Sequence, residues 1–330
     1  MSYPVTRLRR LRRSVPLREM VRETALSASD LIYPLFVVHG EGVKEEIKPL
    51  PGNYHLSIDP LSDEVKEIRD LGIPAVLLFG IPDHRDELAS EAYDPQGIVQ
   101  RAVQRIKKEV PGMVIVTDVC LCEYTPHGHC GILENGYLHN DRSLELLTKV
   151  TLSHAEAGSD IVAPAAMLDG EVGSMRTVLD ENGHIDTVIM GYSAKYASKL
   201  YDPFFKSGTE SALHFGDKKS HQMDFGNSDE AMREIALDIE EGADIVMVKP
   251  GMFYLDIVYR AKKQFGMPLA VYNVSGEYAM IKAAAAAGYL DEKAITWELL
   301  MSFKRAGADL IITYSAKDVA RHMREREVRQ

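Results

Sequence analysis

Two lysines lie where short apolar runs end, and a charged side chain at the end of a buried strand needs a chemical explanation. Lys249 follows the apolar run 245–248 and precedes a Pro-Gly pair, so the sequence predicts a buried strand that ends in a turn. Lys195 follows the run 187–194 in the same way. Desolvation favours the neutral amine, which can attack a carbonyl carbon and form a Schiff base. The alternative is that each side chain simply leaves its strand end for solvent.

The three cysteines of the chain lie within eleven residues, in the segment DVCLCEYTPHGHCG. They are Cys120, Cys122 and Cys130. In a reducing compartment such a cluster favours a metal or redox site over a disulfide. Three sulfur ligands would leave an open coordination position, as a catalytic zinc requires. If His127 or His129 supplied a fourth ligand, the site would instead be a closed, structural one.

The elements that must position these side chains form a repeating pattern. The apolar runs lie at 31–38, 75–80, 113–120, 160–165, 187–194, 244–251, 269–276 and 309–316. Each run is continuous rather than alternating, which is typical of strands buried on both faces of a parallel sheet. The segments 60–71, 97–110, 142–158, 228–242, 253–265, 277–288 and 296–307 carry apolar residues at helical spacing. Several end at glycine in the patterns AGSD, EGAD or AGAD, which predict a helix cap before the next strand.

Eight strand-and-helix units in a 330-residue chain predict a (β/α)8 TIM barrel. An open doubly wound sheet is the alternative, but no G-x-G-x-x-G follows the first strand. In a barrel the carboxyl ends of all strands share one mouth, where catalysis occurs. The polar residues expected at that mouth are Asp118, Cys120, Lys195, Lys249, Ser275, Tyr314 and Ser315. Strands five and six are neighbours, so the two lysines would lower each other's pKa.

A long connection, residues 196–227, shows little apolar periodicity. Connections of that length in a compact domain usually have a function. Gly208 and Gly216 offer flexibility, and polar side chains in the segment predict a lid that closes over an anionic group. Those side chains are Lys206, Lys218, Lys219 and Gln222. A mobile insertion with solvated lysines is the alternative.

The first thirty residues differ from the rest, because five arginines between positions 7 and 13 alternate with apolar residues. We expect residues 1–30 to form an arm and residues 31–330 the catalytic barrel. The arm is either a solvated tail or a segment that packs on a neighbouring subunit. A net charge of −11 argues against a nucleic-acid surface. The chain begins without a signal segment and its apolar runs are too short to span a membrane, so we expect a cytoplasmic protein.

The chain resembles the porphobilinogen synthase (5-aminolevulinate dehydratase) family from end to end. The motifs that carry the resemblance are TDVCLCEYTPHGHCG (117–131), YSAKYAS (192–198), VMVKPGM (246–252), VSGEYAM (274–280) and KRAGADLIITY (304–314). The resemblance implies a TIM barrel whose arm embraces a neighbour, usually in a homo-octamer. It also implies the reaction: two molecules of 5-aminolevulinate condense to porphobilinogen with loss of two waters, in tetrapyrrole and heme biosynthesis.

The resemblance also implies a role for each matching residue. Lys249 is similar to the lysine that forms a Schiff base with the substrate supplying the propionate side, and Lys195 to the lysine that binds the acetate-side substrate. The three cysteines match the ligands of the zinc-dependent branch. Ser275 and Tyr314 match the hydroxyls that bind the first substrate's carboxylate, and Asp118 matches an acidic active-site residue. Glu234 matches a position where family members bind an activating magnesium ion near a subunit contact.

The sequence departs from the family in the pocket wall and the lid. The family usually has APSDMMDGR after the fourth strand, whereas this chain has APAAMLDGE at 163–171, so Ala165 and Ala166 replace a serine and an acid. In the lid Lys206 and Lys218 stand where two arginines usually grip a carboxylate, which keeps the charge but loses the bidentate fork. Two other functions stay open: a weakened homologue that senses aminolevulinate or metal, and a Schiff-base aldolase of the same fold. An ordinary lysine aldolase needs one amine and no zinc, so the cysteines argue against the latter.

Overall fold

The computed structural model describes residues 2–211, 213–214 and 216–327. The first residue of the expected arm, the last three residues of the expected barrel domain and lid positions 212 and 215 lie outside the described residues.

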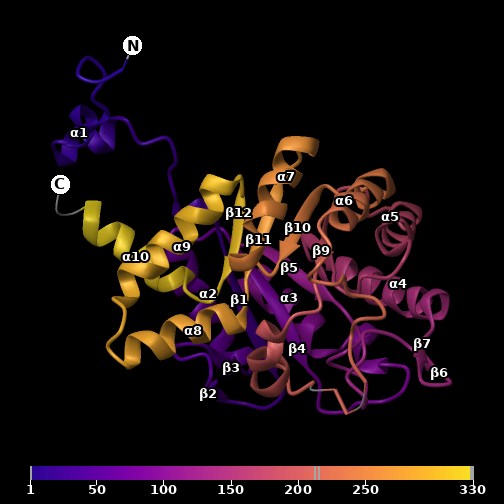
Figure 1. The fold of residues 1–330 in the computed structure, drawn as a ribbon. Helices are drawn as coiled ribbons and strands as arrows, with labels where there is room; N and C mark the ends of the chain where they lie inside the picture. Colours follow the sequence, from indigo (N-terminus) through magenta and orange to yellow (C-terminus); the bar gives the residue numbers. More distant parts are fainter. Residues whose placement is uncertain (1, 212, 215, 328–330) are drawn as a thin grey trace.

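In the described part of the chain, eight parallel strands close into a barrel surrounded by helices (Figure 1). They are β1 (Leu31–Val38), β4 (Ala75–Ile81), β5 (Val114–Val119), β8 (Ile161–Pro164), β9 (Val188–Lys195), β10 (Ile245–Lys249), β11 (Leu269–Asn273) and β12 (Leu310–Thr313). The barrel closes because β12 pairs with β1, with Leu31 opposite Ile311 and Ile32 opposite Ile312. Each of these strands falls within or next to one of the eight predicted apolar runs, and the predicted (β/α)8 barrel is confirmed.

The helices outside the barrel bury their apolar sides against the strands. They are α2 (Ile58–Asp70), α3 (Ile98–Glu109), α4 (Asn140–Ala157), α5 (Glu171–Glu181), α6 (Asp229–Glu241), α7 (Leu255–Phe265), α8 (Ser275–Ala286), α9 (Glu292–Ala306) and α10 (Ala316–Glu327). As the glycine patterns predict, α4 ends at Gly158 and α6 at Gly242, with φ of 104° and 105°. The sequence prediction missed α5 and α10. The first carries only Val172, Met175 and Leu179 as a short buried stripe, interrupted by Gly, Ser, Arg and Thr, and the second is highly charged.

Two short antiparallel pairs add to the barrel at its mouth. Strands β2 (Lys44–Glu46) and β3 (Tyr54–Leu56) pair with each other, and β3 also continues alongside the carboxyl end of β1. Strands β6 (Leu133–Glu134) and β7 (Tyr137–Leu138) form a small hairpin after the cysteine segment. Neither pair was predicted, because strands of two or three residues are too short to show a period.

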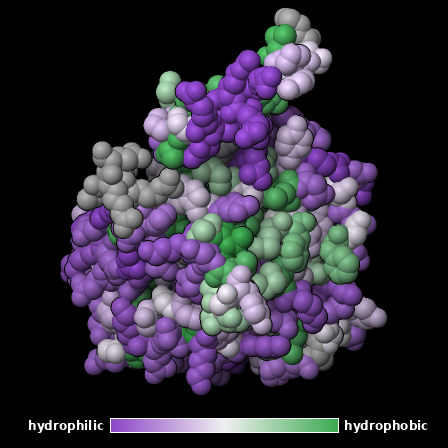
Figure 2. Space-filling view, turned by 60° about the vertical axis from the view of Figure 1, so that its left-hand side comes forward, coloured by the Kyte–Doolittle hydropathy of each residue, from purple (hydrophilic) through white to green (hydrophobic). Residues whose placement is uncertain are grey.

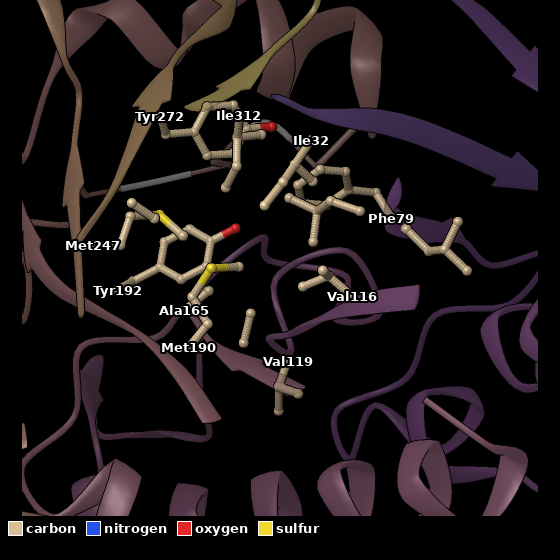
Figure 3. Packing of buried hydrophobic residues seen from close by; sticks show 14 of the residues in the cluster. Ile32, Phe79, Val116, Val119, Ala165, Met190, Tyr192, Met247, Tyr272 and Ile312 are labelled. Atoms are coloured by element: carbon tan, nitrogen blue, oxygen red, sulfur yellow. The ribbon is translucent and has the colours of Figure 1, made fainter. Parts of the chain in front are cut away.

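The barrel interior is a packed apolar core rather than a pore. Figure 3 shows Ile32, Met190, Met247 and Ile312 pointing inward from four different strands. All four are at most 3% exposed, so the core forms a rigid floor below the mouth.

The N-terminal segment stands away from the barrel (Figure 1). It contains a short 3-10 helix (Leu8–Arg12) and α1 (Val15–Met20), and its surface is largely hydrophilic (Figure 2). Leu8 and Met20 are nevertheless 70% and 80% exposed, so the residues that the structure describes leave these apolar side chains largely uncovered. Among the described residues, no helix combines the length and the hydropathy that crossing a bilayer demands.

Candidate active site

A cavity of about 400 Å³ lies at the carboxyl ends of the barrel strands. The predicted residues that line it are Asp118, Cys120, Cys122, Lys195, Lys249, Ser275 and Tyr314. They come from β5, β9 and β10 and from the segments directly after β5, β11 and β12. The strand-end prediction thus identified six residues that meet in one cavity, whereas Ser315, predicted at the same mouth, lines a separate pocket beside α9 and α10.

Lys195 and Lys249 are opposite each other in the ladder between β9 and β10, and each is the last residue of its strand. Both are buried, at 5% and 7% exposure. Burial, and then the charge of Lys195, lower the pKa of Lys249 to about 7, against the opposing charge of Asp118. Near neutral pH a large share of Lys249 is therefore the free amine.

Aromatic rings surround the Lys249 ammonium position. Its Nζ lies 4.4 Å from the ring centre of Tyr272, 4.7 Å from Tyr192 and 5.3 Å from Tyr201. The hydroxyl of Tyr201 also donates to the carbonyl oxygen of Lys249 at 3.1 Å, which fixes the end of the strand. Figure 3 shows Tyr192 and Tyr272 directed into the barrel. The rings exclude water from the amine, and their faces attract the ammonium form only weakly. The aromatic surround therefore leaves both the charged and the neutral amine accessible.

Lys195 behaves differently from its neighbour. Its Nζ donates a hydrogen bond to the carbonyl oxygen of Ala165, on the wall after β8. Burial lowers the pKa of Lys195, but the charges of Cys130 and Cys120 outweigh burial and leave the pKa above its usual value. The expected mutual lowering of the two pKa values therefore applies to Lys249, whereas Lys195 is held in its charged form.

The three cysteine thiols form a compact buried group. In the part of the chain that the structure describes, the sulfur atoms of Cys120, Cys122 and Cys130 all lie within 4.8 Å of one another. Cys120 Sγ and Cys122 Sγ are 3.2 Å apart just beyond β5. The loop bends back to deliver the third thiol, because the Thr125 hydroxyl donates to the carbonyl oxygen of His129 at 3.2 Å. Three soft, buried sulfur donors fit a zinc ion with an open position.

The two histidines considered as a fourth ligand are not members of this group among the described residues. His127 Nδ1 instead accepts the backbone N–H of His129 at 3.1 Å and so helps shape the loop. The arrangement favours three protein ligands over four.

The predicted lid divides into parts that reach the cavity and parts that do not. Phe204 and Phe205 line the cavity, and the Phe204 N–H donates to the Ser275 hydroxyl at 3.1 Å. Lys218 is buried with its Nζ 3.3 Å from Cys130 Sγ. Lys206, by contrast, is exposed and pairs with Asp202 at 2.9 Å. Of the two lysines predicted to grip a carboxylate, the structure thus places Lys218 near the site and Lys206 outside it.

Gln222 and Glu234 line a second cavity of about 960 Å³ between the lid and α6. Asp169, Asp224 and Glu230 line it too. Burial raises the pKa of Glu234, and the negative charges of Asp169 and Glu230 raise it further. Oxygen ligands are those that magnesium prefers. Within the described ranges, however, no three of these carboxylates lie close enough together to form a metal-ligand group.

Sequence reasoning missed the aromatic residues around Lys249 and also Arg85. Tyr192 and Tyr272 lie inside predicted strands, so an inward-facing aromatic near a strand end was an available signal. Arg85 lies in an irregular loop after β4. It donates from Nε to the carbonyl oxygen of Glu123 at 2.8 Å and from Nη2 to that of Thr209 at 3.3 Å. No local pattern could reveal this link between the cysteine loop and the lid.

The Arg85→Ala variant is expected to loosen the lid. It removes both hydrogen bonds from Arg85. The hydrogen bond between His55 and the Gly208 carbonyl oxygen, at 2.7 Å, still holds the lid. Limited trypsin digestion should therefore cut within residues 196–227 roughly 5- to 10-fold faster than in the parent protein, in line with hydrogen bonds from a charged group. Arg101→Ala, at an exposed position on α3, is the matched control. Equal cleavage rates for both variants would refute the link.

A closed parallel barrel with paired buried lysines and a thiol cluster at its mouth is the architecture of an enzyme, and its relatives place it among the lyases. The family model described as delta-aminolevulinic acid dehydratase matches residues 5–322. The chain therefore belongs to the delta-aminolevulinic acid dehydratase family.

Individual relatives agree with this assignment. The chain is 56% identical to delta-aminolevulinic acid dehydratase from Synechococcus elongatus, over 97% of this chain and 99% of that protein. It is 51% identical to the dehydratase from Bacillus subtilis, over 98% of this chain and all of the relative. A crystal structure of the dehydratase (porphobilinogen synthase) from Toxoplasma gondii, in complex with the reaction product porphobilinogen, superposes with a TM-score of 0.95. It shares 43% identity and covers 97% of this chain and 92% of that one.

Proposed function

We propose that the protein is an active, zinc-dependent porphobilinogen synthase that condenses two molecules of 5-aminolevulinate with loss of two waters. The observation that carries the proposal is the pair of buried lysines, opposite each other on β9 and β10, in one cavity with two of the three clustered thiols. Two amines that each bind a keto substrate are what the joining of two carbonyl compounds requires. Family membership supports the same reaction.

In the proposed mechanism Lys249 acts first, because its lowered pKa supplies a free amine. The amine nitrogen attacks the ketone carbon of one substrate, and loss of water leaves a Schiff base within the aromatic surround of the strand end. Ser275 and Tyr314, which line the same cavity, are the hydroxyls proposed to receive that substrate's carboxylate. Phe204 and Phe205 cover the cavity and exclude water.

Lys195 is proposed to hold the second substrate in the same way, on the side of the cavity nearest the cysteines. Asp118 lines the same cavity as both amines. Burial and the charge of Glu123 raise its pKa to about 7, against the opposing charges of Lys249 and Lys195. Asp118 is therefore placed to accept and return protons during the condensation. When bound, a zinc ion at Cys120, Cys122 and Cys130 supplies a Lewis acid for the second substrate's carbonyl oxygen.

Further parts of the proposal concern assembly. Glu234, in the cavity beside α6, is proposed to bind an activating magnesium ion. The arm, residues 1–30, is proposed to embrace a neighbouring subunit of a homo-octamer, which would cover the exposed Leu8 and Met20. We place the enzyme in the cytoplasm, in tetrapyrrole biosynthesis.

The test is an assay of the purified protein with 5-aminolevulinate, with zinc and after treatment with a chelator. Porphobilinogen should form with zinc present and fall sharply after zinc removal. Aminolevulinate binding without pyrrole formation would indicate a sensing homologue instead. Absence of pyrrole at saturating substrate and zinc would refute the proposed activity.

A further inference from the structure

The wall beside Lys195 is made by main chain. It is the loop between β8 and α5, whose first two side chains, Ala165 and Ala166, offer only methyl groups. Lys195 Nζ nevertheless finds a partner there, the carbonyl oxygen of Ala165. What fixes the direction of that carbonyl group therefore also fixes the position of the lysine.

The other end of the same peptide group is held by a buried carboxyl group. The N–H of Ala166 belongs to the peptide that carries the Ala165 carbonyl, and it donates to Glu171 Oε1 at 3.1 Å. The N–H groups of Met167 and Leu168 donate to Glu171 Oε2 at 2.9 and 3.4 Å. Since a peptide group is planar, fixing its N–H also fixes its C=O. Glu171, the peptide and Lys195 thus form one continuous chain of hydrogen bonds.

The charges along this chain of hydrogen bonds reinforce each other. An acceptor on the N–H side of a peptide polarises it and strengthens its carbonyl oxygen as an acceptor. Burial raises the pKa of Glu171 to about 8, against the opposing hydrogen bonds from Ala166 and Leu168 and the charge of Lys195. The charge of Asp238 also raises this pKa. Both carboxyl oxygens have lone pairs that accept N–H donors in either protonation state, so the hydrogen bonds to the loop do not depend on the charge of Glu171.

The loop also needs the carboxyl group of Glu171 to keep its shape. Met167 has a φ of 63°, in the left-handed region that is unfavourable for a residue with a side chain. The two hydrogen bonds from Met167 and Leu168 to Glu171 offset that cost. Without them the loop would relax, and the Ala165 carbonyl would turn away from Lys195.

We propose that Glu171 is a positioning residue for Lys195: through the Ala165–Ala166 peptide it aims a polarised carbonyl oxygen at the lysine nitrogen and supports positive charge there. The inference rests on the proposed function for its chemistry. When the Lys195 ammonium and a ketone form a protonated Schiff base, the C=N bond forms and the C=O bond breaks. The oxygen leaves as water with two of the three ammonium hydrogens. The remaining N–H stays directed at Ala165, so the same support serves reactant and intermediate.

The Glu171→Gln variant tests the proposal with 5-aminolevulinate and borohydride, followed by digestion and quantification of the two lysine peptides. The amide keeps the size of the side chain but places an N–H₂ group against the Ala166 N–H or against those of Met167 and Leu168. The adduct at Lys195 should fall roughly 10- to 100-fold, because the lysine nitrogen is no longer held in line with the bound ketone, while the adduct at Lys249 stays within about twofold. Glu181→Gln, exposed at the far end of the same helix, is the matched control. An unchanged Lys195 adduct in Glu171→Gln would overturn the proposal.

A second measurement needs no substrate. Reductive methylation with formaldehyde at neutral pH reports the share of each lysine present as free amine. Formaldehyde is small and need not be oriented by the site, so its labelling reports only the share of free amine and not the alignment that the aminolevulinate adduct requires. Labelling of Lys195 should rise several-fold in Glu171→Gln, because its charged form has lost support, and equal labelling would count against the role of Glu171. Failure of the parent protein to form any aminolevulinate adduct would count against the proposed function, whereas the methylation result would still decide on Glu171. If Glu171→Gln folds poorly, adding Met167→Gly removes the left-handed strain, and the same labelling rise is expected.

Discussion

The Lys249→Ala variant should lose porphobilinogen formation almost entirely, by roughly 10³-fold or more, as expected when a covalent nucleophile is removed. The lysine is buried among aromatic rings at the end of β10, and its lowered pKa makes it the amine best able to attack a ketone near neutral pH. Borohydride trapping of 5-aminolevulinate at this position should vanish with it. Steady-state kinetics and mass analysis of the trapped protein measure the two effects.

The matched control is Lys199→Ala, an exposed lysine between the two candidate lysines in sequence. That variant should keep both activity and trapping. Undiminished trapping in Lys249→Ala would exclude this lysine as the main Schiff-base residue.

The pH dependence of trapping tests the lowered pKa of Lys249 independently. Because the pKa of Lys249 is lowered to about 7, its reactive neutral form increases as pH rises through that value and levels off above it. Lys195, whose pKa is raised, should remain mostly charged over the same range. In the parent protein the initial trapping rate at Lys249 should therefore climb between about pH 6 and 8. A flat profile over that range would contradict the lowered pKa.

The sequence was most informative where burial is uniform. Strands such as β4 and β10 are covered on both faces, so they appear as continuous apolar runs, and the barrel followed from counting them. The pairing of Lys195 with Lys249 followed in turn, since neighbouring strands in a barrel bring their carboxyl ends together. These inferences need only the period and order of the elements.

The sequence was least informative where main chain and long-range contacts set the geometry. The position of Lys206 depends on the turn that pairs it with Asp202. The hydrogen bond from Arg85 to the Thr209 carbonyl oxygen joins residues 124 positions apart. The effect of Ala165 is the clearest case. Its side chain predicts a lost polar partner, but its carbonyl oxygen meets Lys195, and only the conformation of the loop reveals this. The same conformation brings Glu171 within reach of three consecutive N–H groups.

Cys122→Ala should lower bound zinc and activity together. Its sulfur is one of three that lie within 4.8 Å of one another, so losing it leaves two protein ligands. Removing even an outer-shell partner of a metal commonly costs 10- to 100-fold in affinity, so loss of a ligand should weaken zinc binding by roughly 100-fold or more. Elemental analysis after gel filtration and a pyrrole assay at several zinc concentrations measure both quantities.

Trapping at Lys249 distinguishes a catalytic from a structural zinc in that variant, because this lysine lies at the end of β10 and not in the cysteine loop. If the zinc is catalytic, Cys122→Ala should still form the Lys249 adduct while failing to complete the pyrrole, since the first substrate binds without help from the metal. If the zinc is structural, its loss should lower the melting temperature and abolish the Lys249 adduct as well. Full activity after zinc loss would show that the three thiols have no part in the reaction. The location of Cys120 and Cys122 in the same cavity as both lysines favours the first of these outcomes.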